Sequence, residues 1–487
     1  MEKLLLPFGR YGMILIFLMI LLLVYGSVVT SDYAFSDDYS VLFDAAVHDL
    51  TATSTMLVQG GRPLYAPFNY IFVFMTNLSD YGWIRLFSII GISALASLIY
   101  RHLKTTLEIS NTLALTGAII CVLNPAFQVY SAWTIDAPFS WAACLSGLSS
   151  MALARNGRNP RIDSIFSYCM LSMSMMVYQP SGMMFWAFAA ITMWGAHNTS
   201  DMYKFFAKSF CVMALALVTD FLASKALPRI LFSNVPSFER SAITHDIYGK
   251  LTWFLSEVLP NALRLSSVGD NPLIPMAFIA LIVIGIVSKY YKHPLAIPLY
   301  IALVPLSYTP NLIVAENWPS YRSQVALCTL MALYIFLSIC RLTRGRRFEI
   351  QSEKLMVLAV VYLAFLAHRN VQELIVKPQV KELALIEKYL TDYKTASGTI
   401  LSARSIYFVP AKWEDALVTP MLHDEFGLPS SGQPWAPAGM VWSVLRAKRH
   451  PIPAGLTNFK VGPLSQAPSS VDTLIIDMGK AIHTDFK

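Results

Sequence analysis

The sequence predicts an α-helical polytopic membrane protein that ends in a small α/β domain. Two observations carry the membrane part: 55% of the 487 residues are hydrophobic and only 14% are charged, and the apolar residues gather in runs of about 17–25, long enough to cross a bilayer as helices. A third observation carries the domain. After residue 369 about one residue in five is charged, against about one in eight before it. This composition excludes an ordinary soluble protein.

The apolar runs predict about eleven membrane spans. They lie near residues 11–30, 83–100, 110–130, 137–154, 163–178, 180–196, 205–226, 272–289, 293–314, 322–340 and 354–369. With a cytoplasmic N-terminus, the inside segments hold about three times as many Lys and Arg residues as the outside loops, as the positive-inside rule requires. We therefore expect an uncleaved first span, a cytoplasmic N-terminus and an outer C-terminal domain. The net charge of +7 then reflects topology, and no nucleic-acid partner is expected.

The first outer loop, residues 31–82, contains the adjacent acids Asp37 and Asp38. Neighbouring carboxylates repel one another, which suits a general base or a cation site; a solvated acidic turn is the alternative. The apolar segments 40–58 and 66–78 are too short or too polar to span, and we expect interfacial helices there. We also expect the acidic pair to be exposed, so that an amide at either position barely changes stability.

A second outer loop, residues 227–270, is rich in cations and suits a phosphate or pyrophosphate group. Solvation and lipid-headgroup contact are the alternative. Because most charged residues avoid the span centres, a transporter or pump is disfavoured. The chain has no glycine-rich phosphate loop, HExxH, G-x-S-x-G or CxxC motif. A site on the outer face implies a lipid-borne substrate, since nucleotide-activated donors are cytoplasmic.

The C-terminal domain, residues 370–487, combines helical and strand patterns. Segment 379–394 has the spacing of an amphipathic helix. Segments 399–409 and 471–479 resemble short strands, and the second is almost wholly apolar and so expected to be buried. The six cysteines all lie in or beside apolar runs, which predicts neither a disulfide framework nor a zinc site.

Several motifs resemble a known family. A first span, an acidic pair in a long outer loop and the G-R-P-L-Y turn at 61–65 resemble the GT-C class of polyprenyl-phosphate-sugar glycosyltransferases. More narrowly, three motifs resemble the serotype-converting (Gtr-type) O-antigen glucosyltransferase family: Tyr178-Gln-Pro-Ser, ENWPSYR at 316–322 and DEFGLPSSGQPW at 424–435. The resemblance covers most of the membrane part, residues 1–369, and reaches into the C-terminal domain.

The resemblance implies inverting transfer of a sugar, with glucose the first option, from a polyprenyl-phosphate donor to O-antigen or another lipid-linked glycan. The location it implies is the periplasmic face of a bacterial inner membrane. Asp38 or Asp37 is then the base that takes the proton of the acceptor hydroxyl, and the leaving phosphate requires cations. The phosphate-binding candidates are Arg62 and Arg322, followed by Arg240 and Arg264; the sugar-binding candidates are Tyr178, Gln179, Glu316, Trp318 and Tyr321.

Alternatives remain for these residues and for the function. Tyr178-Gln-Pro-Ser is also typical of a simple turn between two spans, and Glu316 suits a structural pair with Arg322. Adjacent carboxylates can ligate Mg²⁺ or Mn²⁺, but a donor with one phosphate favours no metal, and no cofactor is expected. The rival functions are a transferase of the same class acting on lipid A or another envelope lipid, a flippase or transporter for a lipid-linked sugar, and a non-catalytic scaffold.

Overall fold

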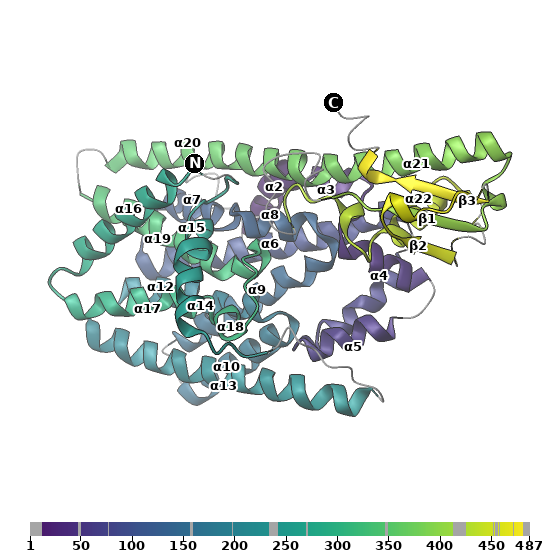
Figure 1. The fold of residues 1–487 in the computed structure, drawn as a ribbon. Helices are drawn as coiled ribbons and strands as arrows, with labels where there is room; N and C mark the ends of the chain where they lie inside the picture. The colour runs from purple at the N-terminus through teal and green to yellow at the C-terminus, as the bar shows by residue number, and fades with distance from the viewer. Residues whose placement is uncertain are drawn as a thin grey trace.

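The protein, seen in a computed structural model, is a largely helical assembly with one small β-sheet (Figure 1). The structure describes residues 12–480 apart from 47–49, 76, 156–158, 197, 233–241, 269–270, 346–348, 413–424, 451, 453–455, 457 and 471. Arg240, a predicted phosphate ligand, and Asp424 of the DEFG motif lie outside the described residues.

Among the described residues, five helical segments are long and apolar enough to cross a membrane. They contain α6 (Tyr81–Leu107), α13 (Thr199–Leu231), α16 (Leu273–Tyr290), α19 (Val325–Thr343) and α20 (Glu349–Val371). A sixth span results if α7 (Asn111–Val122) and α8 (Pro125–Ala132), which meet at 67°, form one broken span. The chain is therefore a helical protein with five or six candidate membrane spans, and the predicted count of about eleven is not confirmed.

The remaining predicted spans coincide with helices that are too short or, for α10, too polar to count as candidate spans. These are α2 (Gly12–Tyr25), α9 (Ala137–Leu153), α10 (Pro160–Val177), α12 (Met184–Gly195) and α17 (Ile297–Leu306). Proline explains part of this shortening, because it has no N–H group and cannot continue a helix. Pro125, for example, begins α8 directly after Asn124, whose side chain accepts a hydrogen bond from the Ala126 N–H group.

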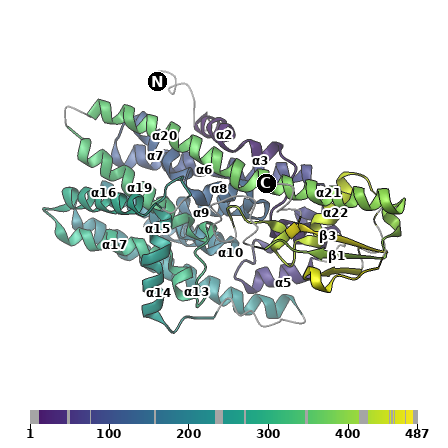
Figure 2. The same ribbon diagram turned by 45° about the horizontal axis from the view of Figure 1, so that its top comes forward.

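The long helices divide into a central and a peripheral set (Figure 2). In the most apolar stretch of the segment containing α19, 78% of the residues are buried, and α6 and α12 pack beside α9 in the same core. The corresponding stretches of α13 and α16 are only 28% buried, and that of the segment beginning with α20 is 17% buried. In a bilayer, lipid tails would cover these apolar outer surfaces.

The first outer loop forms short helices, as predicted, but they pack inward. They are α4 (Asp37–Ala46), α5 (Thr51–Gln59), η1 (Ala66–Val73) and η2 (Leu78–Asp80), and the short α3 (Ser27–Thr30) comes directly before the loop. Helix α4 packs against α22 (Pro437–Ala447) of the C-terminal region. The approach is close, since a Cβ atom on Gly439 would collide with the carbonyl oxygen of Tyr39. The first outer loop and the C-terminal region are therefore in direct contact.

The C-terminal region continues the last span without a break. Helix α20 passes through the π-helical turn η8 (Gln372–Val376) into α21 (Lys377–Ser397), which contains the predicted amphipathic helix, and the two helices lie in line in Figure 1. The sheet is parallel with the order β2-β1-β3, where β1 is Ser405–Val409, β2 is Phe459–Val461 and β3 is Thr473–Asp477. Both predicted strands are confirmed. The three-residue β2 is too short for its alternation to be recognised in the sequence.

Short elements connect these helices at their ends. They are η3 (Thr134–Asp136), α11 (Gln179–Gly182), α14 (Ile247–Trp253), the π-helical η5 (Phe254–Val258), α15 (Leu259–Ala262), η6 (Pro294–Ala296), α18 (Thr309–Ile313), η7 (Tyr321–Gln324), η9 (Ile400–Ser402), η11 (Ser430–Gly432) and η13 (Leu464–Gln466). Two of them, η3 and η7, carry the backbone of the candidate site.

Candidate functional site

Asp38 is fully buried in the first turn of α4. Its carboxylate accepts hydrogen bonds from the backbone of a turn that is distant in the sequence. Its Oδ2 atom accepts hydrogen bonds from the backbone N–H groups of Phe35 (3.0 Å) and Thr134 (3.3 Å), and its Oδ1 atom accepts one from Ile135 (3.0 Å). The prediction that both acids are exposed is therefore wrong for Asp38. Buried backbone N–H groups require acceptors, and Asp38 supplies them to the start of η3.

Asp38 has a buried cation nearby. Arg85, on α6, is fully buried and donates hydrogen bonds of 2.8 Å to the carbonyl oxygens of Tyr33 and Ser31. Burial raises the pKa of Asp38 to about 7, although its hydrogen bonds and the charge of Arg85 act in the opposite direction. The carboxyl group therefore changes its charge near neutral pH. Sequence reasoning missed Arg85, although an ionisable residue inside a predicted span is a recognisable signal.

Asp37, the other member of the pair, is half-buried at the start of the same helix. The hydroxyl group of Tyr65 lies near Asp37 and also near a second carboxylate, the fully buried Asp136 at the end of η3. No role was predicted for Asp136 from the sequence. Burial raises the pKa of the Tyr65 hydroxyl group well above its usual value, and the charges of Asp136 and Asp37 raise it further. The positive charge of Arg62 lowers the pKa of the same hydroxyl group. These charged groups therefore gather around Tyr65.

The Tyr178-Gln-Pro-Ser segment breaks the helix and anchors the turn at 61–65. Pro180 cannot donate a hydrogen bond to the carbonyl group of Met176, four residues earlier. That carbonyl oxygen accepts a hydrogen bond from the Leu64 N–H group instead (3.1 Å). Tyr178 is extended at the break, with φ −162° and ψ 112°. The segment is therefore a turn between two helices, as the simpler interpretation predicts, and it also positions Arg62.

Gln179 strengthens this anchor. Its Nε2 atom donates hydrogen bonds to the carbonyl oxygens of Gly60 (3.2 Å) and Gly61 (2.8 Å) and to Oδ2 of Asp220 (3.0 Å). Gly61 has φ +77°, and a Cβ atom there would collide with the Gln179 amide. The amide of Gln179 thus holds the loop. Asp220, inside α13, was also missed, and its position in an apolar run is the signal that would have found it.

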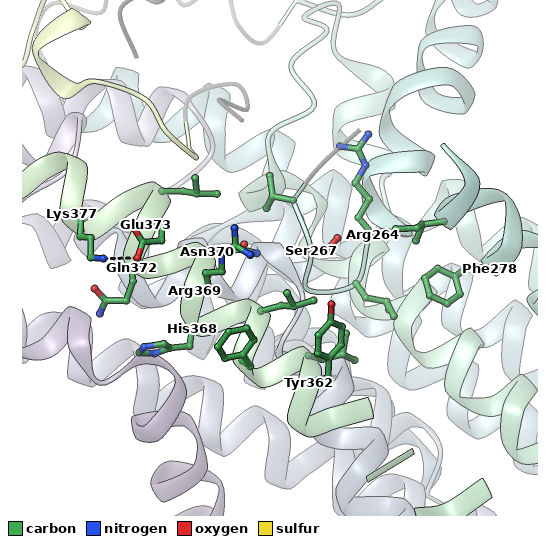
Figure 3. Close-up of a pocket in the computed structure, with 17 residues that line it drawn as sticks. Arg264, Ser267, Phe278, Tyr362, His368, Arg369, Asn370, Gln372, Glu373 and Lys377 are labelled. Atoms are coloured by element: carbon green, nitrogen blue, oxygen red, sulfur yellow. Dashed lines mark hydrogen bonds and ion pairs between the residues drawn. The ribbon is translucent and has the colours of Figure 1, made fainter. Parts of the chain in front are cut away.

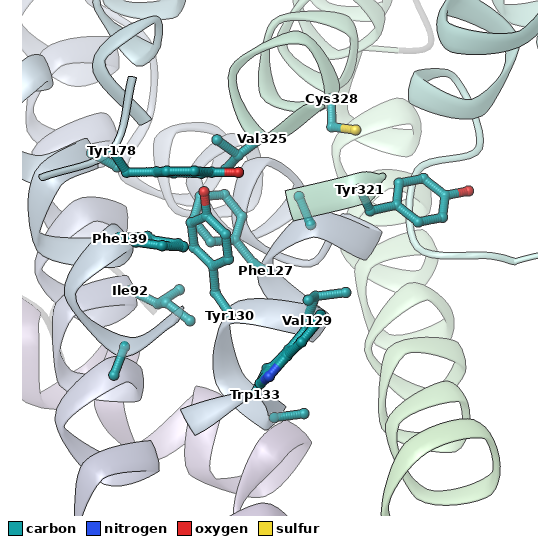
Figure 4. Packing of buried hydrophobic residues seen from close by; sticks show 14 of the residues in the cluster. Ile92, Phe127, Val129, Tyr130, Trp133, Phe139, Tyr178, Tyr321, Val325 and Cys328 are labelled. Atoms are coloured by element: carbon teal, nitrogen blue, oxygen red, sulfur yellow. The ribbon is translucent and has the colours of Figure 1, made fainter. Parts of the chain in front are cut away.

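Two arginines lie on aromatic rings beside this break, and Figure 4 shows three of these rings, Tyr178, Phe139 and Trp133. The Tyr178 ring stacks on Phe139 with 3.9 Å between ring centroids, and the Cζ atom of Arg62 lies 4.8 Å from the Tyr178 ring centroid. The Cζ atom of Arg322 lies 4.2 Å from the Trp133 ring centroid. Burial raises the pKa of the Tyr178 hydroxyl group, and both guanidinium charges lower it. We name these five residues the arginine cluster; the structure brings three predicted site residues together in it.

Glu425, from the DEFG motif, positions Arg322. Its Oε1 atom accepts hydrogen bonds from the Ser320 hydroxyl group (2.6 Å) and the Arg322 N–H group (2.7 Å). Its Oε2 atom accepts one from the Tyr321 N–H group (2.6 Å). The side chain is fully buried. A residue of the C-terminal region therefore fixes the backbone that presents Arg322 to the cluster, a role that the sequence did not predict.

The other predicted residues lie around the cluster. Tyr321, a sugar-binding candidate, is fully buried with its ring against Phe426, where it supports the turn. Glu316 and Trp318 are exposed on the segment before η7. Arg264 is half-buried, and its charged side chain lies within interaction distance of the Tyr321 hydroxyl group. The half-buried members of the predicted site are Asp37, Arg62, Gln179, Arg264 and Arg322.

Within the described part of the chain, no group of three or more His, Cys, Asp or Glu side chains is placed to hold a metal ion. No protein-family model matches the chain, and no curated protein matches it significantly. Function is therefore argued from the arginine cluster and the carboxylates that surround it.

Proposed function

We propose that the protein is an inverting membrane glycosyltransferase. It moves a sugar, with glucose the first option, from a polyprenyl-phosphate carrier to O-antigen or another lipid-linked glycan. The observation that carries the proposal is the arginine cluster, in which two half-buried guanidinium groups lie on aromatic rings. One of them, Arg62, and the half-buried carboxylate of Asp37 both lie near the hydroxyl group of Tyr65. The proposed location is the periplasmic face of a bacterial inner membrane, with the N-terminus in the cytoplasm.

Arg62 and Arg322 suit the leaving group of this reaction. As the bond between the anomeric carbon and the phosphate oxygen breaks, the phosphate takes the electron pair and gains negative charge. Cations already in place stabilise that charge without having to reorganise. A guanidinium group that lies flat on an aromatic ring has a fixed plane, and its N–H edge matches the spacing of phosphate oxygens. Lysine would provide the charge but not this geometry.

Asp37 suits the acceptor side of the reaction. Both oxygens of Asp38 accept backbone hydrogen bonds and the side chain is fully buried, which leaves Asp37 as the member of the pair that can meet a substrate. The acceptor oxygen forms the new bond to the anomeric carbon, and its proton moves to the Asp37 carboxylate. Such a base typically contributes about 10²–10⁴-fold to the rate.

The position of Asp220 bears on the transport alternative. A carboxylate at the membrane midplane would favour a flippase or a pump. Helix α13, Thr199–Leu231, has 33 residues and is about 50 Å long, which exceeds the roughly 30 Å of the hydrocarbon core. Because Gln179 links Asp220 to the carbonyl oxygen of Gly61 in the first outer loop, Asp220 belongs to the level of that loop. The transferase is therefore favoured.

Sugar transfer in purified membranes tests the proposal. The donor is a labelled polyprenyl-phosphate glucose, the acceptor is O-antigen, and the variants are Asp37→Asn, Arg62→Gln and Arg322→Gln. We expect each to lower transfer by about 100-fold or more. The matched controls are Asp392→Asn and Arg404→Gln, both at exposed positions of the C-terminal region, and they should transfer like the wild type.

Two outcomes would contradict the proposal. Normal transfer by the Asp37→Asn variant removes the assigned base, and normal transfer by both arginine variants removes the phosphate site. If the wild type transfers nothing while labelled donor crosses the bilayer, the protein is a flippase. Transfer to lipid A but not to O-antigen would keep the reaction and change the acceptor.

A further inference from the structure

A groove of about 1150 Å³ lies beside the end of α20 from which the chain continues into the C-terminal region (Figure 3). One wall is the stretch of α20 and η8 from Tyr362 to Lys377, and the other is formed by the turn after α15 and by the start of α16. Figure 3 shows Phe278 and Tyr362 toward one end of the groove, and Arg369 and Asn370 toward the other.

The apolar end of the groove faces the surface that a bilayer would cover. Phe278 lies on α16 and Tyr362 and Phe365 lie on α20, and both helices belong to candidate membrane spans. The side chains of Tyr362 and Phe365 are 61% and 59% exposed. A large exposed apolar surface on a membrane helix is covered by lipid tails. The groove therefore opens sideways into the lipid.

The polar end of the groove is cationic. Arg369 and Lys377 belong to the α20–α21 wall and Arg264 to the opposite wall, and the acid among the lining residues, Glu373, pairs with Lys377. His368 lies beside them with Nδ1 2.8 Å from the carbonyl oxygen of Val24, at the end of α2 that leads into the first outer loop. An arrangement of cations at the end of an apolar groove matches a phosphate attached to a long apolar chain.

The cationic end adjoins the arginine cluster. Asn370 donates hydrogen bonds to the carbonyl oxygen of Ser266 (2.6 Å) and to Oε1 of Gln128 on α8 (3.2 Å). The same helix carries Tyr130, whose hydroxyl group donates to the carbonyl oxygen of Arg322 (3.0 Å). The groove residue Asn370 is thus linked through α8 to the backbone of Arg322. A second groove residue, Arg264, interacts with the hydroxyl group of Tyr321, directly before Arg322.

We propose that the lipid carrier of the donor enters the protein through this groove, with its phosphate first at Arg264 and Arg369 and its isoprenoid chain along Phe278 and Tyr362 toward the bilayer, before the phosphate reaches Arg62 and Arg322. The proposal rests on the proposed function and names the place where the carrier leaves the membrane. The carrier is preferred to a bulk phospholipid because the groove ends beside the arginine cluster, where the sugar–phosphate bond would be broken.

Binding of a polyprenyl phosphate to the full-length protein tests this site. The protein is placed in nanodiscs of phosphatidylcholine, and carrier binding is measured by native mass spectrometry. The variants are Arg369→Glu, which reverses a charge in the polar end, and Ser267→Trp, which fills the groove. We expect both to weaken binding by about tenfold or more, since tenfold corresponds to about 1.4 kcal/mol. Arg404→Glu, at an exposed position of the C-terminal region, is the control and should bind like the wild type.

Phosphatidylglycerol is the competing ligand, and sugar transfer is measured on the same samples. Unchanged carrier binding by both groove variants, with thermal unfolding like the wild type, overturns the proposal. Equal binding of phosphatidylglycerol, lost in the same variants, also overturns it and makes the groove a general site for anionic phospholipid. Carrier binding that depends on the groove, without transfer by the wild type, supports the groove and overturns the glycosyltransferase instead.

Discussion

Two buried carboxylates, one in the first outer loop and one in the C-terminal region, have corresponding roles in the arginine cluster. Asp38 accepts hydrogen bonds from the backbone directly after Trp133, and Glu425 accepts them from the backbone at Arg322. Trp133 and Arg322 contact one another, with 4.2 Å between the guanidinium carbon and the ring centroid. Each carboxylate thus holds one partner of the same cation–π contact.

The two regions differ in how firmly they hold it. The hydrogen bonds of Glu425 are 2.6–2.7 Å long and those of Asp38 are 3.0–3.3 Å long. Shorter hydrogen bonds to a charged acceptor are the stronger ones. Asp38 joins two segments of the membrane part, whereas Glu425 reaches into that part from the C-terminal region. Because Glu425 makes the shorter hydrogen bonds, the C-terminal region is part of the candidate site itself.

Removing Glu425 should have the largest effect. The Glu425→Ala substitution leaves two backbone N–H groups and a hydroxyl group without this acceptor, at roughly 1–3 kcal/mol each, or about 5 kcal/mol in total. Sugar transfer should be lost as well, because Arg322 is no longer held. Thermal unfolding in detergent and the transfer assay measure the two effects. A variant as stable as the wild type would show that the C-terminal region only rests against the site.

Changing the pH should change the stability that Asp38 contributes. Its pKa is about 7 in the folded protein against 3.8 as its ordinary value, so between these values the folded state keeps a proton that the unfolded state releases. Stability therefore falls as the pH rises from about 4 to 7, by about 1.4 kcal/mol for each pH unit, and levels off above 7. The contribution of Asp38 is the difference between the unfolding curves of the wild type and Asp38→Asn over this range. A constant difference would contradict the assigned pKa.

Replacing Asp38 by Asn should have a smaller effect than removing Glu425. At pH 5 the wild-type carboxyl group is protonated, and its hydroxyl oxygen can still accept from a backbone N–H group, whereas the NH₂ group of the amide cannot; the loss is about 2 kcal/mol. The difference in stability between the variant and the wild type becomes smaller at higher pH, because the wild type becomes less stable as Asp38 loses its proton. Thermal unfolding at pH 5 measures it. Full stability combined with lost transfer would contradict the positioning role and return Asp38 to the position of catalytic base.

A surface ion pair should have the smallest effect. Lys448, directly after α22, and Glu387 on α21 lie 2.8 Å apart, with their side chains 48% and 38% exposed. Exposed pairs contribute about 0–1 kcal/mol, so Lys448→Ala should leave both unfolding and transfer nearly unchanged. A loss as large as that of Glu425→Ala would mean that surface contacts, and not the buried carboxylate, couple the C-terminal region to the membrane part.

Much of the fold was predictable from the sequence, because apolar runs and alternation reflect burial directly. The helical membrane character, α21 and the strands β1 and β3 follow from such patterns. The number of spans does not, since breaks such as that at Pro125 divide an apolar run without changing its composition. Helix–helix contacts decide which runs remain continuous.

The candidate site was predictable only in part. Arg62, Arg322 and Tyr178 were proposed for it, and they lie together in the structure. The roles of Asp38 and Glu425 depend on backbone N–H groups about 100 residues away along the chain. The sequence does not indicate which distant backbone N–H groups will donate to a given carboxylate. Buried and exposed acids therefore cannot be told apart before the fold is known.

The continuous helix from the last span into the C-terminal region also affects how often the site is complete. The segment Ile350–Ser397 has 48 residues, about 70 Å at 1.5 Å per residue. A flexible linker would let the C-terminal region sample a large volume, whereas a continuous helix restricts the position of α21. Glu382 on α21 accepts hydrogen bonds from the N–H groups of Ser430 and Ser431, a few residues after Glu425. The effective concentration of Glu425 at η7 is therefore high, and the two parts meet without a diffusive search.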